Sequence, residues 1–92
     1  METLKPYRAR IDELDDRIID LLAERMDIVR EVGMVKARDH INTVQPDRVV
    51  EVRERNAERA LKKGLNPNLV RKIYTLIIDE AHEVEQGIAA RS

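Results

Sequence analysis

The sequence predicts an all-α protein of three helices, and three observations support this fold class. Apolar residues recur at alternating intervals of three and four over residues 11–35 and 69–88, and more weakly over residues 49–61. This is the period of an amphipathic helix, with one face turned toward a core. Proline or glycine residues lie between the three stretches, and no strand pattern or internal repeat competes with this interpretation.

The first helix is predicted to begin near Leu4 or Lys5 and to run to about Arg38. Thr3 is the candidate N-cap, and Pro6 is tolerated in the first turn. At about 1.5 Å per residue this helix is roughly 50 Å long, more than a compact three-helix monomer of this length spans. We therefore expect a partner chain to cover part of it.

The second helix is predicted from about Asp47 to Lys63, after a loop over residues 39–45. Pro46 disfavours helix at the residue before it and suits a first helical turn. Gly64 ends the helix, because glycine readily adopts the left-handed cap conformation, and Leu65 supplies the usual apolar contact after such a cap.

The third helix is predicted to start after Asn66 as N-cap, with Pro67 in its first turn, and to end near Ala90. The whole chain, residues 1–92, then forms one small domain. Such a domain is close to the size below which a single chain buries too little surface to fold securely, so oligomerisation would stabilise it.

The composition excludes several classes of function. The 17 basic and 18 acidic residues nearly cancel, and only two residues are aromatic, so nucleic-acid binding is not expected. There is no cysteine, and His40 and His82, which we expect at the surface, are too few for a zinc site. We expect no metal, no cofactor, no membrane segment or signal peptide, and a cytoplasmic location.

One position breaks the apolar stripe of the first helix. The spacing that runs through Leu21 and Ile28 falls on Arg25 between them, and a guanidinium is costly to bury without an anion. Lys36 lies eleven residues later, on almost the same face and about 16 Å away, so the two cations fit a small dianion between them. The alternatives are that Arg25 extends to solvent or pairs with Glu80.

Three other residues have both a functional and an ordinary interpretation. Arg48, at the start of the second helix, either closes over the same site or is solvated. Glu85 flanks the stripe of the third helix and points either inward or to water. Gly33 either allows close packing or ligand contact within the first helix, or is simply tolerated there at about 1 kcal/mol.

Arg8 is too far from Arg25 to share its ligand within one chain, since seventeen residues of helix span roughly 26 Å. It is either an exposed residue at the helix start or reaches the site of a second chain. Antiparallel pairing of two long first helices would bring it there.

The set Arg8, Arg25, Lys36 and Arg48 resembles that of the all-helical chorismate mutases. Three segments carry the resemblance: YRARIDELDDRIIDLLAERMDIVREVGMVKA (7–37), QPDRVVEVRER (45–55) and YTLIIDEAHEVEQ (74–86). The first is the most specific, because its arginine and the lysine eleven residues later reproduce the family spacing without a gap. The resemblance implies an intertwined homodimer of three-helix subunits with two active sites.

The resemblance also implies the chemistry. The family rearranges chorismate to prephenate in one pericyclic step, without a cofactor or a covalent intermediate. Arg25 and Arg8 of the partner subunit would hold the two carboxylates of the substrate. Lys36 would meet a carboxylate and the ether oxygen, and Arg48 would line the same pocket.

Four positions depart from the family pattern. Gln45 and Val49 stand where acidic residues normally meet the ring hydroxyl, and Ala81 replaces a serine. Glu85 replaces a glutamine that donates a hydrogen bond to the ether oxygen, and a glutamate donates only when protonated.

These departures leave three alternatives beside chorismate mutase. The QPxRV string and the glutamate of IIDEAxxxE resemble the 4-amino-4-deoxychorismate mutases. Isochorismate-pyruvate lyases share the fold and an arginine followed by valine. A non-enzymatic dimerisation module would explain the long helix but not the cations in its seam.

Overall fold

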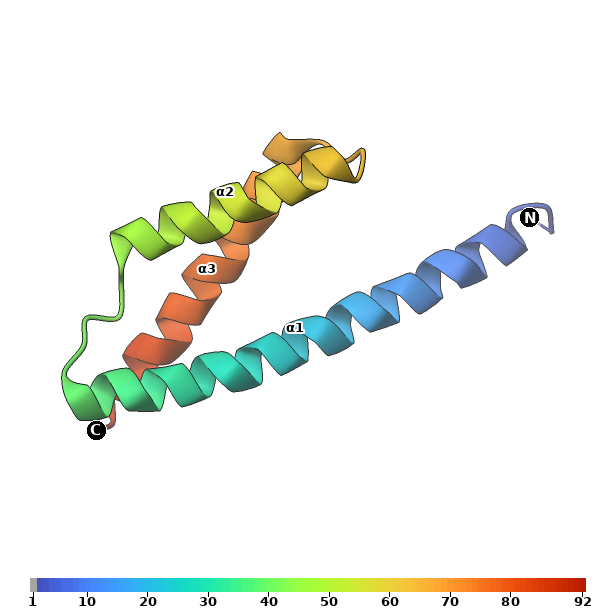
Figure 1. Cartoon of the computed structure of the whole chain (residues 1–92). Coiled ribbons are helices and arrows are strands. Elements are labelled where there is room, and N and C mark those ends of the chain that lie inside the picture. Colours follow the sequence, from blue (N-terminus) through green and yellow to red (C-terminus); the bar gives the residue numbers. More distant parts are fainter. Residues whose placement is uncertain (1) are drawn as a thin grey trace.

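The computed structural model describes residues 2–92, which form three α-helices and no strand (Figure 1): α1 (Lys5–Asp39), α2 (Pro46–Lys62) and α3 (Pro67–Ala90). The all-α prediction is confirmed, and each helix begins and ends within about one residue of its predicted bounds. None of these helices is long and apolar enough to cross a membrane.

The predicted cap at Thr3 is wrong. The N-cap of α1 is Leu4, whose carbonyl accepts a hydrogen bond from the Arg8 amide at 2.9 Å, and no side chain caps this end. The helix thus begins one residue after the position that Thr3 would cap. The Lys5 amide donates instead to the Glu2 carbonyl at 3.3 Å.

Glycine ends α2 as predicted. Gly64 has a φ of 75°, in the left-handed region. The Leu65 amide donates to the Ala60 carbonyl at 2.9 Å, and the Gly64 amide to the Leu61 carbonyl at 3.2 Å. This pair of bonds is a Schellman motif, which satisfies the last carbonyls of the helix and turns the chain toward α3.

Two further caps set the direction of the chain. Asn66 accepts a hydrogen bond from the Asn68 amide at 2.9 Å, which confirms it as the N-cap of α3. At the end of α1, His40 has a φ of 56°, and the Ile41 amide donates to the Lys36 carbonyl at 2.8 Å. The left-handed His40 therefore directs the chain from α1 into the loop before α2.

The third helix holds the fold together. It packs against both α1 and α2, which do not pack directly against each other within residues 2–92. In Figure 1, α3 crosses between α2 and the C-terminal half of α1. The buried apolar residues are few and mostly small: Ala57, Ala60, Ile78 and Ala81.

Gly33 is buried where α1 meets α3. A Cβ atom at this position would lie 2.9 Å from Ile88 Cδ1 and 3.4 Å from Glu85 Cα. Glycine therefore allows the two helices to approach closely, and this supports the close-packing interpretation of Gly33 over a merely tolerated residue.

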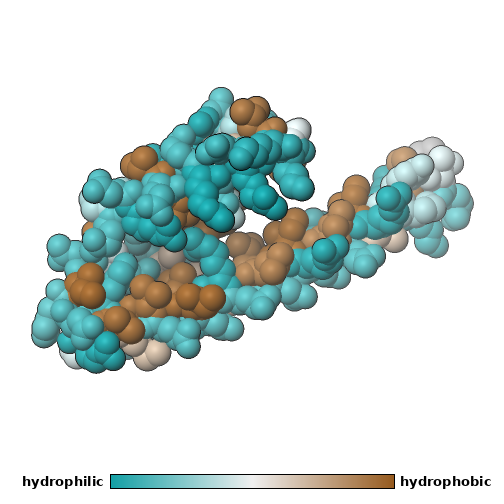
Figure 2. Space-filling model, viewed as in Figure 1, coloured by the Kyte–Doolittle hydropathy of each residue, from teal (hydrophilic) through white to brown (hydrophobic). Residues whose placement is uncertain are grey.

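The N-terminal half of α1 packs against no other element of the described residues (Figure 1). Ile11, Leu14 and Ile18 are each more than half exposed, and Figure 2 shows apolar atoms along this helix beyond the other two. The radius of gyration is 16.6 Å, against about 12 Å for a compact domain of this length. One chain alone leaves its apolar seam in water.

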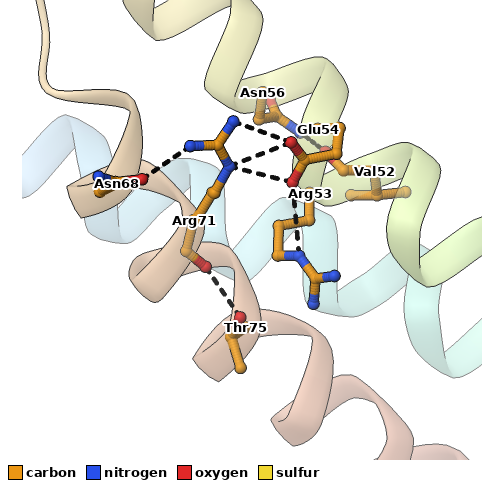
Figure 3. Close-up of polar contacts among 7 residues, drawn as sticks. All are labelled: Val52, Arg53, Glu54, Asn56, Asn68, Arg71 and Thr75. Atoms are coloured by element: carbon orange, nitrogen blue, oxygen red, sulfur yellow. Dashed lines mark hydrogen bonds and ion pairs between the residues drawn. The ribbon is translucent and has the colours of Figure 1, made fainter.

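A polar cluster joins α2 to α3 on the outer surface (Figure 3). The Arg71 guanidinium donates through Nε to both carboxylate oxygens of Glu54 at 3.1 Å, and through Nη2 to one of them at 2.9 Å. Arg53 lies 3.6 Å from the same carboxylate. The hydrogen bond from Arg71 lowers the pKa of Glu54, with the charges of Arg71 and Arg53 acting in the same direction.

A lowered pKa means that ionised Glu54 stabilises the folded state at neutral pH and that this contribution is lost as the pH falls through the lowered pKa. We predict that Glu54→Gln unfolds at a lower temperature than the wild type at pH 7, by a modest amount because the pair is exposed. The difference should shrink steadily as the pH is lowered below the ordinary glutamate value of 4.5. Thermal unfolding of both proteins across this range measures it, with the exposed Glu83→Gln as control. An equal difference at all pH values would contradict this account.

Candidate active site

A cavity of about 320 Å³ opens between the three helices and the loop before α2. This volume is at the lower end of the range for small-molecule sites. Its walls are both apolar and charged. The lining residues are Arg25, Ile28, Val29, Val32, Lys36, Thr43, Gln45, Arg48, Val49, Val52, Ile78, Ala81, His82 and Glu85.

Lys36 reaches the cavity from α1 and is held by two acceptors. Its Nζ donates to Glu85 Oε1 at 2.7 Å and to the Thr43 carbonyl at 2.7 Å. An ammonium has three N–H donors, so one remains for a ligand. The two bonds fix Lys36 between α3 and the loop, which limits the directions in which that third donor points.

Glu85 is the buried acid of the site, only 5 % exposed, so the inward orientation considered for it is confirmed. Its ion pair with Lys36 satisfies a carboxylate that would be costly to bury alone. The close approach at Gly33 brings the Glu85 backbone against α1, and this packing sets the depth at which the carboxylate lies.

Arg25 lines the same cavity and is partly buried. Within residues 2–92 its guanidinium forms no hydrogen bond or ion pair, so the alternative pairing with Glu80 is wrong. Both side chains border a second groove between α1 and α3, yet no salt bridge joins them. Arg25 is a cation of the cavity that the described chain does not neutralise.

The loop and α2 supply Gln45, Arg48 and Val49 to the opposite wall. Gln45 Nε2 donates to the Asn42 carbonyl at 2.8 Å. Because a carbonyl only accepts, this bond orients the amide and leaves Oε1 as a free acceptor. Arg48 lines the cavity but is exposed and paired with Glu51 on its own helix, so it would have to leave Glu51 to bind a ligand.

On the α3 side of the cavity, the prediction that His82 lies at the surface is wrong. Ala81 is buried at the cavity as its spacing indicates, but His82, expected at the surface, also lines the cavity and is partly buried. His40 is exposed. His82 lies three residues before Glu85, and residues at this spacing share a helix face, so this spacing is the signal that points to it. The contact of Lys36 with the Thr43 carbonyl has no signal in the sequence, because it involves a backbone atom.

Arg8 lies exposed on the N-terminal part of α1, outside the cavity. Without it, the lining still carries Arg25, Lys36 and Arg48 against the single carboxylate of Glu85. The cavity is therefore positive and partly apolar, which suits a compact organic anion.

Residues 7–86 match the sequence profile of the family chorismate mutase type II. The chain belongs to this family. As a chorismate mutase of this type it is an enzyme of the isomerase class, and the matched region includes all eight of the predicted site residues.

The curated relatives of this chain do not all carry the same name. The chain is 32 % identical over 88 residues to a 4-amino-4-deoxychorismate mutase of Streptomyces venezuelae, covering 96 % of this chain and 85 % of the relative. A 4-amino-4-deoxychorismate mutase of Streptomyces pristinaespiralis is 31 % identical, with 91 % and 65 % covered. A chorismate mutase of Methanocaldococcus jannaschii is 28 % identical, with 86 % and 80 % covered.

Proposed function

We propose that this enzyme rearranges chorismate to prephenate. The observation that supports this most directly is the charge of the cavity, where three cations face one carboxylate. Chorismate carries two carboxylates. Lys36 is paired with Glu85 and Arg48 with Glu51, so one carboxylate would bind the unpaired Arg25 and the other would draw Arg48 away from Glu51. The apolar side chains Ile28, Val32 and Ile78 offer a surface for the ring.

In this proposal, binding supplies much of the catalysis. Arg25, which has no partner among residues 2–92, binds one carboxylate of the substrate. Arg48 turns from Glu51 toward the cavity. Holding both ends of the molecule keeps the enolpyruvyl arm over the ring, and this positioning removes part of the entropic barrier to the pericyclic step.

The remaining donor of Lys36 supplies the electrostatic part. As the carbon–oxygen bond breaks and the new carbon–carbon bond forms, negative charge grows on the ether oxygen. An ammonium held by Glu85 and Thr43 needs little reorganisation to donate there. A preorganised donor of this kind typically contributes about 3 kcal/mol to lowering the barrier.

We further propose that the enzyme is an intertwined homodimer in which Arg8 of the partner subunit completes each site. The exposed apolar stripe of α1 supports this, since two antiparallel copies of the helix would cover each other's seams. The same pairing would carry Arg8 across to the second carboxylate.

The second candidate substrate is 4-amino-4-deoxychorismate. The names of two relatives favour it, and so does the absence of acidic residues at Gln45 and Val49. Gln45 Oε1 is a neutral acceptor that suits either a hydroxyl or an amine. The protonated amine lowers the net negative charge of this substrate to one, and the cavity offers it no unpaired carboxylate. For this reason chorismate is proposed first.

The test is a product analysis. Purified protein is incubated separately with chorismate, isochorismate and the 4-amino analogue, and products are separated by chromatography. We predict prephenate as the main product, with slower turnover of the amino analogue. Faster turnover of the amino analogue than of chorismate would show that the analogue is the substrate. Release of pyruvate from isochorismate would indicate a lyase. Turnover of none would support a non-enzymatic helical module.

A pH profile tests the role of Glu85. If protonated Glu85 donates to the ether oxygen alongside Lys36, activity should fall as the pH rises and this proton is lost. Glu85→Gln carries a permanent donor and should flatten the profile. Steady-state rates of both proteins from about pH 5 to about pH 9 measure this. A wild-type rate that stays constant across the range would remove Glu85 from the donor role.

A further inference from the structure

His82 is the residue of the cavity for which the proposed mechanism has no use. Its imidazole borders the cavity from α3, between Ala81 and Glu85 in the sequence. Within residues 2–92 it forms no hydrogen bond or ion pair, so both ring nitrogens are available. An imidazole is also the only ordinary side chain that changes charge between about pH 5 and pH 8.

The charged groups that face the same cavity come from all three helices. Arg25 and Lys36 project from α1, Arg48 from α2 and Glu85 from α3. From the loop, the cavity is lined by Thr43 and Gln45, neither of which is ionisable at these pH values. Glu85 is already paired with Lys36, so no free carboxylate stands ready for a positive group on a ligand.

The two candidate substrates differ in one ring substituent, which is a hydroxyl in chorismate and an ammonium in the amino analogue. The interaction of His82 with this substituent would depend on whether the imidazole is neutral or charged. A ring hydroxyl is neutral and both donates and accepts hydrogen bonds, so either form of imidazole is compatible with it. A ring ammonium only donates. Neutral imidazole accepts from it, whereas imidazolium repels it and at the same time attracts a dianion.

We propose that His82 discriminates between substrates, its imidazole favouring the dianionic hydroxyl substrate over the ammonium-bearing analogue as the pH falls. This rests on the proposed function. His82 here acts on binding and specificity, while the reacting bonds remain with Lys36 and Glu85. Because Val49 and Ala81 offer no polar group, the uncharged polar side chains left to recognise the ring substituent are Thr43, Gln45 and neutral His82. Of these three, only His82 can gain a positive charge.

The experiment measures kcat/KM for chorismate and for 4-amino-4-deoxychorismate at about pH 7.5 and about pH 5.5, where the amine stays protonated. We expect the ratio of the two values to rise about tenfold at the lower pH in the wild type. In His82→Asn, which is polar but cannot gain a proton, the ratio should change less than about twofold. If one compound is not turned over, its inhibition constant against the other replaces its kcat/KM.

The control is His40→Asn, the same chemical change at an exposed residue outside the cavity. Asparagine tolerates the left-handed backbone there, and this variant should keep the wild-type rise. Any effect of pH that does not come from His82 persists in His82→Asn, so the inference is tested by the difference between the two proteins. A wild-type ratio independent of pH, or an equal rise in His82→Asn, would overturn the inference while leaving the proposed function intact. Absence of both turnover and inhibition with either compound would overturn the proposed function itself.

Discussion

One face of α1 both packs in the core and lines the cavity. The placement of the charges and the exposed apolar stripe both depend on this double use. The apolar stripe of α1 contains Arg25 and continues to Lys36. Among residues 2–92, only the second of these cations has an acidic partner, Glu85, and it also donates to the Thr43 carbonyl. Arg25 stays beside the cavity without an acid. A partly buried cation is tolerated when an anion completes its surroundings, and a negatively charged group of a ligand in the cavity would do this for Arg25.

The same double use links catalysis to assembly. The N-terminal half of α1 packs against neither α2 nor α3 and exposes apolar side chains such as Ile11 and Ile18. The buried apolar residues of α2 and α3 are mostly alanines, and each alanine contributes little hydrophobic stabilisation. A second copy of α1 would cover the stripe and carry Arg8 toward the cavity. Stability, oligomeric state and completion of the site would then depend on one interface, so dissociation would impair all three.

Local signals predicted the helices and most of the cavity. Gly64 and Asn66 ended and restarted helices as their backbone preferences require, and helical spacing grouped Arg25 with Lys36. Helical spacing did not predict features that depend on contacts between distant parts of the chain. Thr3 does not cap α1, because the helix begins one residue later. His82 was assigned to the surface from its charged neighbours, although its spacing from the buried Glu85 indicated the cavity. The pairing of Lys36 with the Thr43 carbonyl depends on how the loop folds back, which periodicity does not describe.

The most direct test of a site shared between chains is complementation of two inactive variants. Arg8→Ala and Lys36→Met are assayed alone and after refolding together in equal amounts, with Arg10→Ala as an exposed control that should stay active. If each site takes Arg8 from one chain and Lys36 from the other, half of the dimers are mixed and each has one intact site, so about one quarter of wild-type activity returns. If both residues act within one chain, no dimer contains an intact site, and a mixture as inactive as its components would contradict the account.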